Sequence, residues 1–148
     1  MPSIYVIAGE ASGDVLGARL MQALKQQGNH QFFGIGGDMM AKEGLSSLFP
    51  MQDLSIMGLV EIIPSLPRII KHVYKTVDDI VDKQPDVVIT IDSPDFCKPV
   101  VKRARKKCPN TKFIHYVAPT VWAWRAGRAK SDSEGERDGL RFLTLGER

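Results

Sequence analysis

The segment Val87–Ile91 constrains the fold most, because each of its residues is β-branched and none is charged. Such a run predicts a strand buried on both faces, as in a parallel sheet covered by helices. Further short, largely apolar runs predict strands at Ile4–Ala8, Gln31–Ile35 and Phe113–Val117. Segments with helical spacing separate these strands. We therefore expect an α/β fold with a mostly parallel sheet, right-handed crossovers and helices on both faces.

Apolar residues at helical spacing predict three longer helices. The first follows Asp14, which we expect to cap it, and ends at Gly28. The second spans residues 66–83, and the third spans Phe96–Lys107. Two smaller predicted elements are a short helix at Asp38–Glu43 and a short strand at Ser47–Phe49.

The composition fits one globular domain, with 43% apolar and 25% charged residues among 148. The sequence has no secretory signal pattern and no stretch of roughly 20 apolar residues, so we expect a cytoplasmic chain. Its two cysteines lack C-x-x-C spacing and its three histidines lack metal-ligand spacing, which predicts no disulfide framework, metal or cofactor. Ten Lys or Arg and no Asp or Glu lie between Lys98 and Lys130. This block suits phosphate, anionic lipid or nucleic acid, and equally a solvated helix face.

Ligands of open parallel sheets bind at the carboxyl ends of the strands, which selects three loops here. The first, Gly9–Asp14, matches neither a P-loop nor a dinucleotide fingerprint. Its small residues let a ligand approach the backbone, and the following helix offers N–H groups to an anion. A tight turn with Ser12 as helix cap explains the same residues. Glu10 favours function, since folding alone does not require a carboxylate in this turn.

The second loop begins with Asp92, where the buried strand emerges. A carboxylate there is held rigidly and partly desolvated, which can raise its pKa into a range that suits a general base. Asp95 follows Pro94, and this pair is more typical of a turn and a helix start.

The third loop, residues 118–125, contains Trp122, Trp124 and Arg125. Trp rings stack on sugar rings or cover acyl chains, and Arg can hold a phosphate. The same tryptophans equally suit a plug at the end of the domain.

An apolar segment in the middle of the chain carries more large side chains than one helix face can bury. Arg68 and Lys71 lie beside it. An apolar patch rimmed by basic residues suits the interface of an anionic membrane, whereas burial against a further domain or a second subunit explains it without a membrane. The residues of this apolar set are Val60, Ile62, Ile63, Leu66, Ile69 and Ile70.

Five blocks of the sequence resemble lipid-A-disaccharide synthases in the same order: AGEASGD with LGARLMQALK, GIGGDMMAKEG, LSIMGLVEI, ITIDSPDF and IHYVAPTVWAWR. The resemblance covers about Ile4 to Lys130. It implies the N-terminal half of a GT-B fold, in which two Rossmann-like domains face a cleft. It also implies an inverting glycosyltransferase without a metal, which joins UDP-2,3-diacylglucosamine to 2,3-diacylglucosamine 1-phosphate (lipid X). The products are lipid A disaccharide 1-phosphate and UDP.

The resemblance further implies a location and residue roles. The family is peripheral on the cytoplasmic face of the Gram-negative inner membrane, an anionic surface, and has no nucleic-acid partner. Asp92 matches the family's proposed base, and the apolar set matches its membrane-facing, acyl-binding helix. The residues that match its substrate-binding loops are Gly9, Glu10, Ser12, Gly13, Asp95, Trp124 and Arg125.

The domain organisation departs from the family after Lys130. We expect residues 1–130 to form the acceptor-side domain and residues 131–148 to be an irregular tail, with the C-terminal UDP-sugar domain absent. A cleft with one wall cannot exclude water or align donor with acceptor, so we expect little or no transferase activity from this chain alone. The main alternative is a non-catalytic membrane-surface module that binds acylated sugar phosphate. Another nucleotide-sugar enzyme, such as an epimerase, fits the apolar segment less well.

Overall fold

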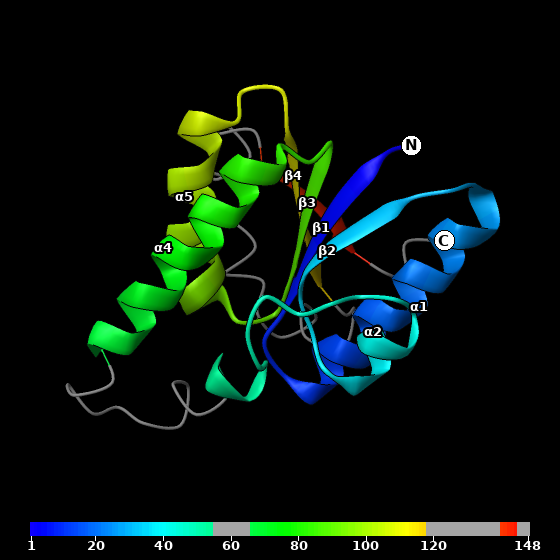
Figure 1. Cartoon of the computed structure of the whole chain (residues 1–148), viewed down its shortest axis with the longest axis horizontal. Helices are drawn as coiled ribbons and strands as arrows, with labels where there is room; N and C mark the ends of the chain where they lie inside the picture. Colours follow the sequence, from blue (N-terminus) through cyan, green and yellow to red (C-terminus); the bar gives the residue numbers. More distant parts are fainter. Residues whose placement is uncertain (55–65, 118–139, 145–148) are drawn as a thin grey trace.

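The computed structural model describes residues 1–54, 66–117 and 140–144. Within these residues, five strands form one parallel sheet in the order β2-β1-β3-β4-β5 (Figure 1). The predicted Rossmann-like α/β arrangement is therefore confirmed. The strands are β1 (Ser3–Ala8), β2 (Gln31–Ile35), β3 (Val87–Ile91), β4 (Lys112–Val117) and β5 (Leu140–Thr144).

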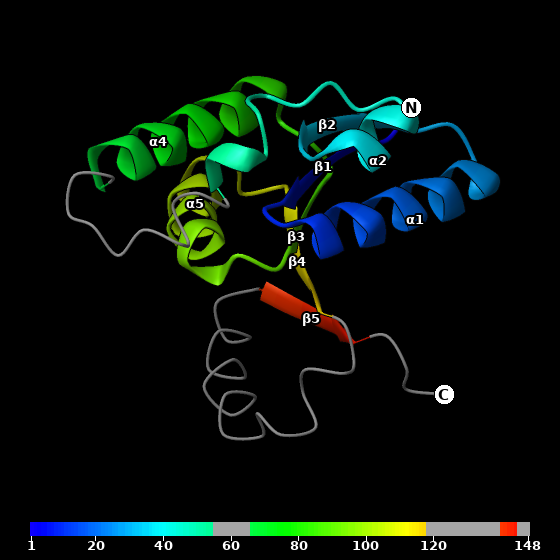
Figure 2. The ribbon, with the colours of Figure 1, turned by 90° about the horizontal axis from the view of Figure 1, so that it is seen from below.

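The helices lie on both faces of this sheet, as the sequence predicts. Helices α1 (Ala11–Gln27) and α2 (Asp38–Lys42) pack together on one side, and α4 (Leu66–Lys83) and α5 (Pro94–Lys107) pack together on the other (Figures 1 and 2). None of the described helices is long and apolar enough to cross a membrane. In this arrangement, the carboxyl ends of β1 and β3 lie next to the N-termini of α1 and α5.

The core is centred on β1 and β3, which are inner strands with helices on both sides. Tyr5 of β1 is fully buried, and its hydroxyl donates a hydrogen bond to Asp79 Oδ2 on α4 at 2.8 Å. The other oxygen of Asp79 pairs with Lys83 Nζ at 2.8 Å. The one polar atom of this buried ring is therefore satisfied, and the bond fixes α4 against the central strand.

Asp14 anchors α2 to α1. Its side chain is 5% exposed, and its carboxylate accepts hydrogen bonds from the backbone N–H groups of Gly37, Met39 and Met40 at 2.9 to 3.0 Å. These donors lie at the N-terminus of α2, where N–H groups lack partners within the helix. The expectation that Asp14 caps α1 is wrong, because α1 begins earlier, at Ala11, and its first turn directs this carboxylate at α2.

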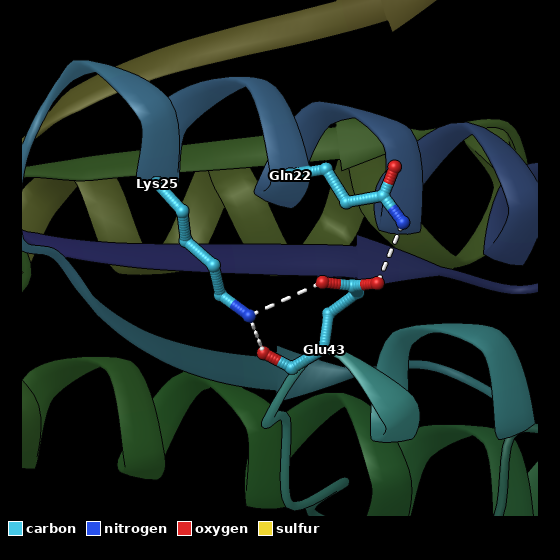
Figure 3. A network of polar contacts seen from close by, with 3 residues as sticks. All are labelled: Gln22, Lys25 and Glu43. Atoms are coloured by element: carbon cyan, nitrogen blue, oxygen red, sulfur yellow. Dashed lines mark hydrogen bonds and ion pairs between the residues drawn. The ribbon is translucent and has the colours of Figure 1, made fainter.

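A second contact joins the same two helices near the C-terminus of α2. Gln22 Nε2 donates to Glu43 Oε1 at 2.6 Å, and Lys25 Nζ lies 3.2 Å from Glu43 Oε2 and also donates to the Glu43 carbonyl (Figure 3). Water and salt screen an ion pair at the surface, so this pair adds little to stability. The buried Asp14 is therefore the stronger link between α1 and α2.

Two predictions about strands need correction. Residues 131–148 were expected to be irregular, but Leu140–Thr144 forms β5 and pairs in parallel with β4. This largely apolar segment can pair with the backbone groups along the edge of β4, and local charge alternation did not reveal that pairing. The predicted strand Ser47–Phe49 is reduced to an isolated bridge between Gly34 and Ser47.

Candidate functional site

The carboxyl ends of β1 and β3 lie side by side in the middle of the sheet. These strands are paired in register through their last residues, so Gly9 and Asp92, which follow them, are neighbours. Helix α1 starts directly after β1 with Glu10 at its N-cap, and α5 starts directly after β3 with Ser93 at its N-cap. A carboxylate and two helix N-termini therefore meet at the sheet edge where α/β folds bind ligands.

Asp92 is held by two hydrogen bonds to one of its oxygens. The backbone N–H of Gly9 donates to Asp92 Oδ1 at 3.0 Å, and Ser93 Oγ donates to the same oxygen at 2.9 Å. Asp92 and Ser93 both adopt left-handed backbone conformations, with φ of 52° and 45°. Consecutive non-glycine residues in this region are strained, and such strain concentrates at functional sites.

Two glycines make room for this carboxylate. A Cβ atom at Gly13 would lie 2.1 Å from Asp92 Oδ2, and one at Gly9 would lie 1.9 Å from Ser93 Oγ. Oδ2 is buried against the first turn of α1 and has no hydrogen-bond partner among the described residues. Any side chain at Gly13 would therefore displace the carboxylate from its position.

Burial raises the pKa of Asp92 to about 6 from an ordinary value of 3.8. The hydrogen bonds from Ser93 and Gly9 oppose this rise in pKa, and the negative charge of Glu10 adds to it. A carboxyl group with this pKa is mostly ionised at neutral pH, yet it is basic enough to accept a proton from a reacting group. The site therefore has the chemistry of a general base.

The other predicted substrate-binding residues have different positions. Gly9 and Gly13 contact the Asp92–Ser93 loop, and Glu10 and Ser12 are exposed at the start of α1. Asp95 is exposed in the first turn of α5. Trp124 and Arg125 lie outside the described residues.

The apolar set is only partly described. Val60, Ile62 and Ile63 lie outside the described residues, and Leu66 is the first residue of α4. Ile69 is half-buried and packs against the core, whereas Ile70 is 47% exposed.

Sequence reasoning missed the role of Ser93. A serine between a strand end and Pro94 resembles an ordinary helix cap, and nothing in the pattern shows that its hydroxyl turns back to Asp92. The signal that could have found it is the adjacent carboxylate, because short polar side chains often bond to near neighbours. Across residues 1–54, 66–117 and 140–144, no group of three or more His, Cys, Asp or Glu side chains is placed to hold a metal ion.

The fold and the site together define a class: a Rossmann-like α/β domain with a partly buried carboxylate of raised pKa between two helix N-termini, at the sheet edge where such folds bind ligands. Comparison with known proteins is more specific. The model of the lipid-A-disaccharide synthetase family matches residues 4–134, so the chain belongs to this family.

Curated relatives agree with this assignment. The chain is 52% identical over 129 residues to the lipid-A-disaccharide synthase of Rhodospirillum centenum, a match that covers 86% of this chain and 32% of the relative. It is 51% identical over 130 residues to that of Paramagnetospirillum magneticum (86% and 33%) and 48% identical over 130 residues to that of Alcanivorax borkumensis (87% and 33%). The chain thus spans about a third of the length of these relatives.

Proposed function

We propose that residues 1–130 form the acceptor-side domain of a hexosyltransferase in lipid A biosynthesis, with Asp92 as its general base. The proposed reaction transfers 2,3-diacylglucosamine from its UDP derivative to 2,3-diacylglucosamine 1-phosphate. It yields lipid A disaccharide 1-phosphate and UDP. Family membership supports the reaction class, and the position of Asp92 at the end of β3, with a pKa raised to about 6, supports the choice of base.

In the proposed mechanism, an acceptor hydroxyl attacks the anomeric carbon of the donor sugar. Its oxygen forms the new glycosidic bond while the bond from that carbon to the UDP oxygen breaks, with inversion of configuration. The carboxylate of Asp92 takes the hydroxyl proton, and UDP leaves with the electron pair of the broken bond. Helix N-termini near Asp92 favour negative charge and suit phosphate groups of the substrates.

The remaining predicted residues fit around this step. Ser12 and the backbone near Gly13 would contact substrate phosphate or sugar at the start of α1, with Glu10 beside them. Trp124 and Arg125 stay predicted substrate contacts of the third loop. Because the relatives are about three times as long as the matched region, we propose that the UDP-sugar site lies mostly in a second domain.

The decisive test uses a full-length context, with residues 4–134 of this chain joined to the rest of the Rhodospirillum centenum relative. Asp92→Asn should lower the rate of disaccharide formation by about a hundredfold or more, because Asn cannot take a proton. Asp82→Asn, an exposed change on α4, is the control and should leave the rate near that of the parent. Unchanged turnover in a folded Asp92→Asn protein would remove Asp92 from this role.

The 148-residue chain alone should form no measurable disaccharide.

A membrane-surface role is a second proposal, favoured by an exposed apolar patch on α4. Ile70 and Tyr74 are 47% and 51% exposed and lie one turn apart, with exposed Lys71 and Lys75 next to them. The guanidinium of Arg103 on α5 lies 5.4 Å from the centre of the Tyr74 ring. Apolar side chains rimmed by cations suit the anionic face of a bacterial inner membrane.

Vesicle co-sedimentation tests this surface. The chain should bind vesicles that contain anionic lipid, and Ile70→Gln should weaken binding severalfold because it removes buried apolar contact. Met39→Gln, on the exposed Met39 of α2, is the matched control and should bind like the parent. Binding that ignores anionic lipid and survives high salt would contradict the electrostatic part of the proposal.

A further inference from the structure

Ser93 occupies the N-cap of α5, yet its side chain does not cap the helix. A serine at this position usually accepts a hydrogen bond from a backbone N–H in the first turn of its own helix. Here the backbone carbonyl of Ser93 accepts the bonds from Phe96 and Cys97, whereas the hydroxyl donates to Asp92 Oδ1 at 2.9 Å. The hydroxyl is therefore directed at the candidate base and away from the helix.

This bond distinguishes the two oxygens of Asp92. Oδ1 receives both donors, the Ser93 hydroxyl and the Gly9 N–H, while Oδ2 lies buried against Gly13. The side chain of Ser93 also packs directly on Gly9, where a Cβ would come within 1.9 Å of its Oγ. The hydroxyl is therefore enclosed between the two loops that build the site and can hold the carboxylate in one orientation.

We propose that Ser93 is a positioning residue for Asp92, whose hydroxyl fixes the rotamer of the carboxylate and stabilises its charged form. The assignment rests on the proposed role of Asp92 as the base. The hydrogen bond from Ser93 also explains why the partly buried Asp92 carboxyl still ionises at neutral pH.

The titratable groups that act on Asp92 are few among the described residues. Glu10, before α1, raises the pKa of Asp92 by its negative charge. Cys97 faces Asp92 from α5, and burial raises the pKa of its thiol, so it stays neutral across the relevant range. A change in the Asp92 titration after loss of the Ser93 hydroxyl can therefore be separated from the titration of its neighbours.

The test follows the Asp92 carboxyl by carbon-13 NMR in the 148-residue chain, with Asp92→Asn used to assign its signal. Ser93→Ala and Ser93→Gly should both move the titration midpoint upward by about one pH unit, because each removes a donor to the charged form. Gly relieves the left-handed backbone whereas Ala does not, so an equal shift in both variants identifies the hydroxyl as the cause. Ser12→Ala removes an exposed hydroxyl at the same edge and should leave the midpoint in place.

Three outcomes would overturn the proposal: an unchanged midpoint in both Ser93 variants, a shift in the Ala variant alone, or an equal shift in Ser12→Ala. In the full-length context, Ser93→Gly should move the acid limb of the rate profile upward by the same amount, a loss of about fivefold at pH 6. Full activity of Asp92→Asn would refute the base itself, whereas an unmoved titration in the Ser93 variants would refute only the positioning role.

Discussion

Asp14 and Asp92 are both enclosed carboxylates near the first turn of α1, and their surroundings differ. Asp14 accepts three backbone N–H groups from the start of α2, shared between its two oxygens. Asp92 receives two donors on Oδ1, and its Oδ2 is buried without a partner among the described residues. The Asp14 carboxylate uses both oxygens to hold two helices together, whereas only one oxygen of Asp92 is hydrogen-bonded among the described residues.

This difference in hydrogen bonding distinguishes the structural carboxylate of Asp14 from Asp92, the proposed base. Asp14 is buried and Asp92 is partly buried, so both carboxylates are at least partly removed from water. A buried oxygen without a hydrogen-bond partner costs folding free energy, and use in a reaction is one reason for a protein to retain it. The strained backbone of Asp92 and Ser93 supports the same conclusion.

The largest expected effect on stability is the loss of the Asp14 carboxylate. Asp14→Ala leaves three N–H groups of α2 without their acceptor and should lower the free energy of unfolding by about 3 kcal/mol. Asp38→Ala, an exposed acidic residue in the first turn of α2, is the control and should cost less than about 1 kcal/mol. Urea denaturation of the 148-residue chain measures both values, and equal losses would contradict the structural role of Asp14.

A smaller effect should follow from filling the space beside Asp92. Gly13→Ala places a Cβ 2.1 Å from Oδ2 and should destabilise the chain by about 2 kcal/mol. In an Asp92→Ala background the carboxylate contact is gone and a 3.3 Å contact with Ile91 Cγ2 remains, so the same change should cost much less, because Ala favours a helix over Gly. Additive effects in this double-mutant cycle would show that Gly13 and Asp92 do not interact.

The smallest effect concerns pH. The folded pKa of Asp92, about 6, exceeds its unfolded value near 3.8, so the unfolded chain releases the proton first as pH rises. Stability contributed by the protonated carboxyl is therefore present below pH 4 and lost as pH rises through 6. Asp92→Asn lacks this loss and should gain about 1 to 2 kcal/mol relative to the parent between pH 4 and pH 7, after allowance for partial exposure. A constant difference across this range would contradict the raised pKa.

Much of the sheet could be predicted from the sequence, because its signals are local. The β-branched run of β3 and the apolar start of β1 indicate buried parallel strands without knowledge of their partners. The segment that forms β5 is largely apolar, but it lies in a stretch of alternating charges that we expected to be irregular, and its pairing with β4 depends on an edge that local pattern does not reveal. Helices α1 and α5 begin a few residues before their predicted starts for a similar reason. Ala11 and Pro94 can each begin a helix, and tertiary contacts decide where the helix starts.

The candidate site was predictable in position and not in detail. The strand-end rule selected Asp92, and burial there led to the expected raised pKa. The three bonds that Asp14 accepts join residues far apart in the sequence, which periodicity does not indicate, and the bond from Ser93 depends on a side-chain orientation that the sequence does not show. A short polar residue next to a carboxylate is the local pattern that indicates such a bond.

The most direct test of Asp92 as the base is its titration in the unmodified chain, followed by carbon-13 NMR of its carboxyl group. Burial at the end of β3 should give a midpoint of about 6, and the Asp92→Asn variant identifies the signal by its loss. A midpoint near the ordinary value of 3.8 would mean that the carboxylate is well solvated at the end of β3, and the proposed base would then lack its physical foundation.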